Sequence, residues 1–173
     1  MLDFATHIYT FILPLFVGNV LHMLLVKRNT FAWLARPLSL PLFGAGKTYR
    51  AFLVMPLVCG FTCLLLRTAV LHDANLGWSF AMGFILGLVY LLGELPNSYV
   101  KRHMGIGAGQ SHDRLKWLQY VIDKTDSLLP MCLVYYFLVA ISVRDLLLLF
   151  FVSFLIHVTF SWLLFRIRVK KSF

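Results

Sequence analysis

Apolar runs of about 20 residues recur along this chain between short polar segments, and this pattern restricts the fold more than any other feature. A helix needs roughly 20 apolar residues to cross the hydrocarbon core of a bilayer. The runs predict five membrane spans, at about 8–26, 51–71, 76–100, 128–143 and 146–165. Because the fourth run is short for a full crossing, we expect that helix to be tilted or partly buried in the bundle.

The composition argues against an ordinary soluble domain. Apolar residues make up 60% of the 173 residues and charged residues only 13%. A soluble domain of this size could not hide so much apolar surface from water. We therefore predict an all-α polytopic membrane protein, in which residues 1–173 form a single domain built as a bundle of about five transmembrane helices.

The basic residues decide the predicted orientation. The formal net charge is +9, but Lys and Arg gather at the ends of apolar runs, which indicates a bilayer surface as their partner and no nucleic acid. One side of the predicted bundle carries all of them except Arg67 and Arg144. The positive-inside rule makes that side cytoplasmic, with the N-terminus outside and the C-terminus inside a cytoplasmic membrane. The two long loops, about 27–50 and 101–127, then share the cytoplasmic face.

The third run ends in polar side chains at helical spacing. Glu94, Ser98 and Lys101 follow at i, i+4 and i+7 along one helix face, with Asn97 beside them. A carboxylate inside a membrane-spanning pattern is costly and faces a partner, an ion or a water-filled cavity. Two interpretations of Glu94 remain open: an ion pair with Lys101 or Lys47, and a role in binding a metal or a substrate.

Two aspartates precede the fourth run. Asp123 and Asp126 are spaced i, i+3, so that both carboxylates point the same way if the segment is helical. Carboxylates suit Mg²⁺, which takes oxygen ligands and bridges phosphate groups. Alternatively, Asp126 caps the following helix with Ser127 in support, an interpretation that leaves Asp123 unexplained.

The first long loop contains a third cluster, over residues 44–50. Its glycines free backbone N–H groups to approach an anion, and Lys47 and Arg50 supply positive charge. The run Gly46-Lys47-Thr48 is not a P-loop, because the glycine that this motif requires five positions earlier is Pro41. A basic anchor for anionic lipid remains the alternative.

The second long loop predicts a short amphipathic helix after its glycine-rich start. The apolar side of that helix would carry Leu115, Leu118 and Ile122, and the polar side Asp113, Lys116 and Lys124. Together, the loops and the end of the third run bring carboxylates, hydroxyls and cations to one face. Such a set suits phosphoryl or nucleotidyl transfer at a membrane surface, because metal and cations offset the phosphate charge in the transition state.

Two motifs of the chain belong together: Gly93-Glu94-x3-Ser98-x2-Lys101-Arg102 and Asp123-x2-Asp126-Ser127. This pair resembles the signature of membrane CTP-dependent cytidylyltransferases, which make CDP-diacylglycerol from phosphatidate and CTP. The small size and the run Gly46-Lys47-Thr48-Tyr49-Arg50 more closely resemble the CDP-archaeol synthase branch of that superfamily. The branch has five membrane helices and an early helix carrying Pro and Asn, which Pro14 and Asn19 match.

The resemblance implies an activity and a set of site residues. Mg²⁺ would hold CTP while the phosphate of a lipid attacks the α-phosphorus, so that pyrophosphate leaves and a CDP-activated lipid remains for phospholipid synthesis. The implied metal ligands are Glu94, Asp123 and Asp126, which form the implied catalytic set with Lys101. The implied substrate-binding residues are Lys47, Thr48, Arg50, Ser98, Arg102 and Asn19. The family usually carries Gly-Asp where this chain has Gly93-Glu94.

Other functions stay open from the sequence. A CTP-dependent kinase for polyprenol or another lipid would share some of this chemistry but release CDP instead of pyrophosphate. A non-catalytic or transport protein on the same fold is the other alternative, although transporters more often have broken helices or inverted repeats around a midplane site. We also expect a homodimer, because five short helices leave a polar cavity poorly enclosed.

Overall fold

The computed structural model describes residues 3–107 and 116–166 of the chain. Apart from one isolated bridge between Pro37 and Thr48, the regular structure of these residues is helical. The helices are α1 (Phe4–His7), a π-helical turn (Ile8–Ile12), α2 (Leu13–Lys27), a 3-10 turn (Ala32–Leu34), α3 (Leu40–Phe43), α4 (Tyr49–Ala69), α5 (Leu76–His103), α6 (Lys116–Thr125), α7 (Leu128–Leu138) and α8 (Val143–Arg166).

Four helical segments in the described part of the chain are long and apolar enough to cross a membrane. They are Phe4–Lys27, Tyr49–Ala69, Leu76–His103 and Val143–Leu163. These segments coincide with the first, second, third and fifth predicted spans. The protein is therefore an all-α polytopic membrane protein, as the apolar runs predicted.

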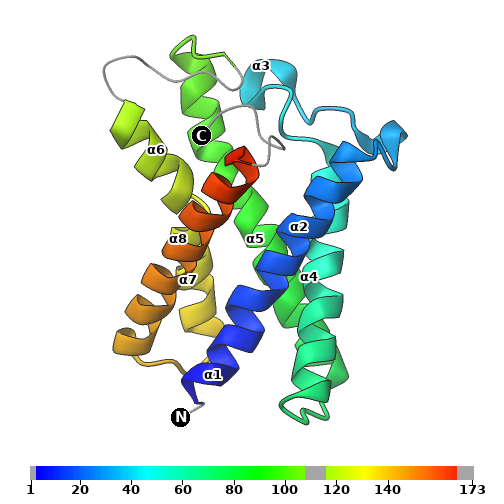
Figure 1. Ribbon diagram of the computed structural model, residues 1–173, viewed down its shortest axis with the longest axis vertical. Helices are drawn as coiled ribbons and strands as arrows, with labels where there is room; N and C mark the ends of the chain where they lie inside the picture. Colours follow the sequence, from blue (N-terminus) through cyan, green and yellow to red (C-terminus); the bar gives the residue numbers. More distant parts are fainter. Residues whose placement is uncertain (1–2, 108–115, 167–173) are drawn as a thin grey trace.

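The fourth predicted span differs from the other four. α7 has 11 residues, which gives it a length of about 16 Å at 1.5 Å per residue, roughly half of the hydrocarbon thickness. Its Met131 and Tyr135 are fully buried, so that α7 is the short and partly buried helix that the sequence predicted. In Figure 1, α6 and α7 follow one another down the bundle and together make the pass between α5 and α8.

The turn between α7 and α8 falls slightly earlier than predicted. The predicted fourth and fifth spans left Arg144 and Asp145 between them, but α8 already begins at Val143. The Ser142 hydroxyl accepts the backbone N–H of Asp145 at 3.0 Å and donates to the Asp145 carboxylate at 2.7 Å. The Ser142 hydroxyl thereby satisfies one free backbone N–H group of the first turn, and the helix begins before the charged pair.

Glycines allow α4 and α5 to pack very closely. A Cβ atom on Gly83 would lie 2.3 Å from the Cys59 carbonyl oxygen, and one on Gly87 would lie 3.0 Å from the Cα atom of Pro56. The two glycines are four residues apart and therefore line one face of α5. Small residues at this spacing bring membrane helices together where lipid supplies no hydrophobic drive for association.

The bundle separates its polar groups into two ends. In Figure 1, α3, the start of α6 and the C-terminal end of α5 lie at one end, and α1 and the α4–α5 turn lie at the other. At the α1 end, the Arg67 guanidinium pairs with Asp73 and also donates to Ser79 Oγ at 3.1 Å and to Thr10 Oγ1 at 3.3 Å. The α3 end holds the predicted site residues of the two long loops.

Candidate active site

The polar residues at the end of α5 follow one another at helical spacing, but their side chains reach different partners. Ser98 turns back onto its own helix, because its hydroxyl donates to the Glu94 carbonyl at 2.9 Å. Asn97 and Lys101 instead reach across to Asp123 in the last turn of α6, and Asn97 also reaches Asp126 just after it. The Glu94 carboxylate turns the other way, toward the loop before α4.

Lys47 forms an ion pair with Glu94. The loop that carries Lys47 is closed by two backbone hydrogen bonds, one from Leu38 N to Lys47 O at 2.8 Å and one from Tyr49 N to Arg36 O at 3.1 Å. The sequence left the partner of Glu94 open between Lys47 and Lys101, and the structure selects Lys47. This pairing holds the loop before α4 against α5.

A single side-chain amide joins the two aspartates. The Asn97 Nδ2 atom donates to Asp123 Oδ1 and to Asp126 Oδ2, each at 2.7 Å. Lys101 adds an ion pair to Asp123, with its Nζ atom 2.6 Å from Oδ2. The predicted convergence of the two carboxylates is therefore present, and the amide that completes it is a residue that the sequence did not assign to the site.

Gly93 explains how the aspartates come so close to α5. A Cβ atom at this position would lie 2.6 Å from Pro130 Cγ, 2.8 Å from the Asp126 carbonyl oxygen and 3.0 Å from Ser127 Cα. Only glycine leaves room for the backbone of the α6–α7 junction. The capping alternative for Asp126 is not what forms, because the N-cap of α7 is Ser127 without a side-chain cap and the Asp126 carboxylate binds Asn97.

The electrostatic environment of Asp126 is incompletely balanced. Burial raises the pKa of its carboxyl to about 6, and the negative charges of Glu94 and Asp123 act in the same direction, while the Asn97 hydrogen bond and Lys47 oppose them. Its Oδ1 atom is buried and has no hydrogen-bond partner among the described residues. A buried carboxylate oxygen without a partner costs free energy, and a cation would remove that cost.

The two arginines of the predicted substrate set hold loops in place. The Arg50 Nη1 atom donates to the Thr30 carbonyl at 3.0 Å. Arg102 donates to the Ile106 carbonyl, and its Nε atom lies 3.1 Å from where a Cβ atom on Gly44 would stand. Gly44 has a φ of 76°, a left-handed conformation that favours glycine. Neither Nε atom has a hydrogen-bond partner in the described part of the chain, so that each arginine retains a donor.

Thr48 and Asn19, the two uncharged members of the predicted substrate set outside α5, both bond to the backbone of helices. The Thr48 hydroxyl caps α4, since it accepts the backbone N–H of Ala51 at 3.4 Å. Asn19 lies on α2 and donates to the Leu15 carbonyl at 3.2 Å. It does not join the charged cluster directly, but the Tyr90 side chain interacts with both Asn19 and Glu94 and so connects the two places.

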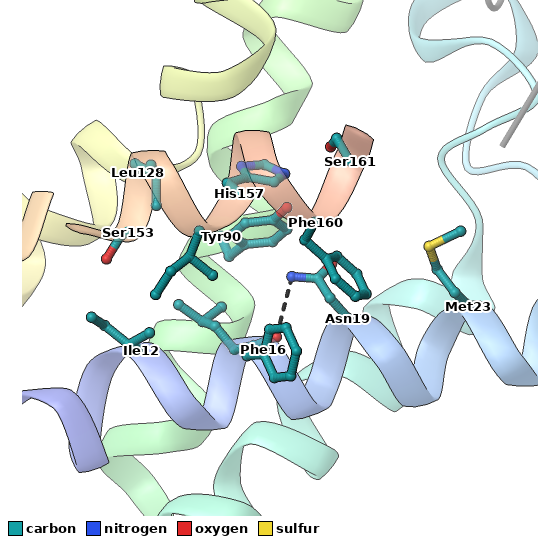
Figure 2. Close-up of a pocket in the computed structure, with 12 residues that line it drawn as sticks. Ile12, Phe16, Asn19, Met23, Tyr90, Leu128, Ser153, His157, Phe160 and Ser161 are labelled. Atoms are coloured by element: carbon teal, nitrogen blue, oxygen red, sulfur yellow. Dashed lines mark hydrogen bonds between the residues drawn. The ribbon is translucent and has the colours of Figure 1, made fainter. Parts of the chain in front are cut away.

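Asn19 lines a cavity of about 190 Å³ between α2, α5 and α8. Figure 2 shows Asn19 and Tyr90 pointing into the space between α2 and α8, with His157 above them. Most of the wall is apolar, from residues such as Ile12, Leu15, Phe16, Ile156 and Phe160. Sequence patterns did not predict this cavity, because they identify apolar helix faces but not where neighbouring helices leave a space.

Lys124 shows which way the predicted amphipathic helix, α6, faces. The sequence placed it on the polar side together with Asp113 and Lys116. This side faces the bundle at Lys124, which is only 5% exposed and contacts Ser161 of α8 through its Nζ atom. Trp117, at 77% exposure, and Leu118 face outward instead. The apolar side of α6 therefore faces outward and its polar side faces α8. Asp113, Leu115 and the Lys116 side chain lie outside the described residues.

The oxygen atoms of Asp123 and Asp126 fit a magnesium ion. Among the described residues, no group of three or more His, Cys, Asp and Glu side chains is close enough to hold a metal, and Glu94, the third implied ligand, is paired with Lys47. Mg²⁺ is usually bound by only one or two carboxylates together with water and substrate phosphates. The donor set therefore suits a cation that shares its coordination with a polyphosphate.

These features define a class: a polytopic all-α membrane protein with paired carboxylates and lysines gathered at one end of its helices. The comparison with known families is more specific. Residues 1–173, the whole chain, match the family model described as CarS-like: CDP-archaeol synthase, and the protein belongs to that family. Membership implies CTP-dependent transfer of a cytidylyl group to a lipid phosphate, and it confirms the resemblance drawn from the two motifs. No curated protein and no solved structure matches the chain.

Proposed function

We propose that this protein transfers the cytidylyl group of CTP to the phosphate of a membrane lipid, giving a CDP-activated lipid and pyrophosphate. The observation that carries the proposal is the convergence of Asp123 and Asp126 on one amide, beside Lys101 and next to the Lys47–Glu94 pair. Family membership supports the same reaction class. We further propose that residues 1–173 act as one domain in the cytoplasmic membrane, with the site on the cytoplasmic side.

In the proposed reaction, an oxygen of the lipid phosphate forms a bond to the α-phosphorus of CTP, and the bond from that phosphorus to the bridging oxygen of the β-phosphate breaks. Asp123 and Asp126 would hold Mg²⁺, which supplies charge neutralisation along the triphosphate. Lys101 and Lys47 would turn to the phosphates after leaving their carboxylate partners. Their ammonium groups would then stabilise the negative charge that develops on the transferring group and on the leaving pyrophosphate.

The cavity between α2, α5 and α8 supports a lipid as the acceptor. Its apolar wall lies among membrane-spanning helices, and it contacts the charged cluster through Tyr90. A chain of methylene or isoprenoid units packed there would leave its phosphate near the end of α5. An acceptor of the phosphatidate or isoprenoid type meets both requirements, whereas a soluble phosphate meets only one.

The direct test is product analysis with purified protein in nanodiscs. We expect CTP, Mg²⁺ and phosphatidate, archaetidic acid or polyprenyl phosphate to yield pyrophosphate and a CDP-lipid. Asp123→Asn and Glu94→Gln should abolish the reaction, whereas Asp3→Asn, the same chemical change at an exposed position near the N-terminus, should not. Absence of pyrophosphate with all three acceptors would overturn the proposal, and release of CDP would identify a lipid kinase instead.

A further inference from the structure

We propose that Asn97 is a metal-ligating residue, whose side-chain oxygen completes the Mg²⁺ site of Asp123 and Asp126. This inference rests on the proposed function only in taking those two aspartates as the metal site. It assigns the third protein ligand to Asn97 on α5, in place of the neighbouring Glu94, which the motif resemblance implied.

The first argument is geometric. The Asn97 Nδ2 atom lies 2.7 Å from one oxygen of each aspartate. A half-turn of the terminal amide exchanges its nitrogen and oxygen and leaves the rest of the side chain in place. The oxygen would then stand at the same separation from the two carboxylate oxygens. Neighbouring oxygens around Mg²⁺, at ligand distances of about 2.0–2.1 Å in octahedral geometry, are separated by about 2.9 Å, so the existing spacing nearly matches one corner of such a shell.

The second argument is chemical. Without a cation, the Asn97 N–H groups hold two carboxylates that would otherwise repel one another. With a cation between them, the same amide can offer its oxygen, because asparagine carries both a donor and an acceptor on one flat group. Lysine or arginine at this position would hold the carboxylates equally well but could never turn to bind a metal.

The third argument concerns charge. Two aspartates balance the charge of Mg²⁺ once Lys101 leaves Asp123, and a neutral amide adds a ligand without making the site more negative. Glu94 would add a third negative charge, but it is already paired with Lys47. The buried Asp126 Oδ1 atom has no hydrogen-bond partner among the described residues, so the site also retains one carboxylate oxygen with no bond of its own.

A Mn²⁺-binding assay tests this assignment without CTP, lipid or turnover. Binding is measured as the decrease in the EPR signal of free Mn²⁺. Full-length protein in nanodiscs is titrated and the dissociation constant is compared among variants. Asn97→Ala should weaken Mn²⁺ binding by roughly tenfold or more, in the range found when metal-site partners are removed. Asn97→Asp should bind Mn²⁺ at least as tightly as the parent, because aspartate supplies an oxygen ligand. The Asn97→Asp substitution should also lower the Tm of the protein in EDTA, and addition of Mn²⁺ should restore that Tm.

Asn97→Asp separates the two possible roles of the amide. If Asn97 only donates hydrogen bonds to the aspartates, aspartate at this position repels them and weakens Mn²⁺ binding, which would overturn the proposal. Unchanged binding in Asn97→Ala would also overturn it. Asn29→Asp adds the same charge on an exposed loop and should change neither quantity. Normal Mn²⁺ binding by the parent without any pyrophosphate release would refute the proposed function and leave the Asn97 assignment intact.

Discussion

Replacing Gly93 by alanine should displace the aspartates and lower kcat strongly, while the stability of the bundle falls only modestly. The added methyl group would meet Pro130 Cγ at 2.6 Å, the Asp126 carbonyl oxygen at 2.8 Å and Ser127 Cα at 3.0 Å, whereas ordinary contact begins at 3.4 Å. Two of these atoms belong to backbone that cannot turn aside as a flexible side chain can. The α6–α7 junction must therefore move away from α5 and carry Asp126 with it.

The size of the effect follows from that displacement. Overpacking of this kind costs about 1–3 kcal/mol in stability, which leaves most of the protein folded. The backbone of Asp126 must retreat from 2.8 Å to about 3.4 Å, and a misplacement of about 1 Å costs roughly a hundredfold in rate where reacting groups are held in line. We expect kcat to fall by about tenfold or more while the Tm falls only modestly.

Two other glycines provide matched controls. Gly83→Ala places a methyl group 2.3 Å from the Cys59 carbonyl oxygen, in the α4–α5 contact, so it should lower the Tm more than Gly93→Ala does and leave kcat per folded molecule nearly unchanged. Gly77→Ala, near the start of α5, has only Asn75 Oδ1, at 4.0 Å, close to its new methyl group and should leave kcat unchanged. The measurements are Tm and initial rates of pyrophosphate release well below each Tm. Full activity in Gly93→Ala, or an equal loss of kcat in Gly83→Ala, would refute the reasoning.

Two pH effects should also be measurable. Because burial raises the pKa of Asp126 to about 6, a metal must displace a proton at lower pH, so Mn²⁺ affinity should fall about tenfold per pH unit below about pH 6; in Asp126→Asn this dependence should vanish. At the opposite end of the bundle, the Asn75 backbone N–H and the Arg67 guanidinium lower the pKa of Asp73. Its stabilising effect is therefore present above the ordinary aspartate pKa and lost as the pH falls through the folded value. Asp73→Asn should lower the Tm at pH 7, and the difference from the parent should disappear in acid.

Local patterns in the sequence predicted the features that depend on one helix at a time. The apolar runs located the four long helices, and the shortness of the fourth run anticipated α7. The spacing of Glu94, Ser98 and Lys101 placed them on one face of α5, and the spacing of Asp123 and Asp126 brought their carboxylates to one amide. Each of these predictions needs only the period of a helix, which the residue order supplies directly.

Contacts between helices were beyond the reach of the same patterns. Periodicity assigned Lys124 to the polar side of its helix, but only the position of α8 shows that this side is covered. The sequence identified Asn97 as a neighbour of Glu94 and Lys101, yet its role depends on a junction 26 and 29 residues further along the chain. The sequence motif included Gly93 but did not explain why a glycine is needed there. The structure explains it, because Asp126 and Ser127 lie too close for a side chain at this position.

The distribution of charge in the site without substrate gives a physical reason for glutamate at position 94. Lys47 neutralises Glu94 and Lys101 neutralises Asp123, so that Asp126 is the carboxylate without a lysine of its own. That imbalance contributes to its raised pKa. The extra methylene of glutamate, compared with the aspartate usual in the family, lengthens the reach of position 94 toward the Lys47 loop. In the proposed reaction, phosphate oxygens would replace the carboxylates on both lysines as the cation takes the two aspartates.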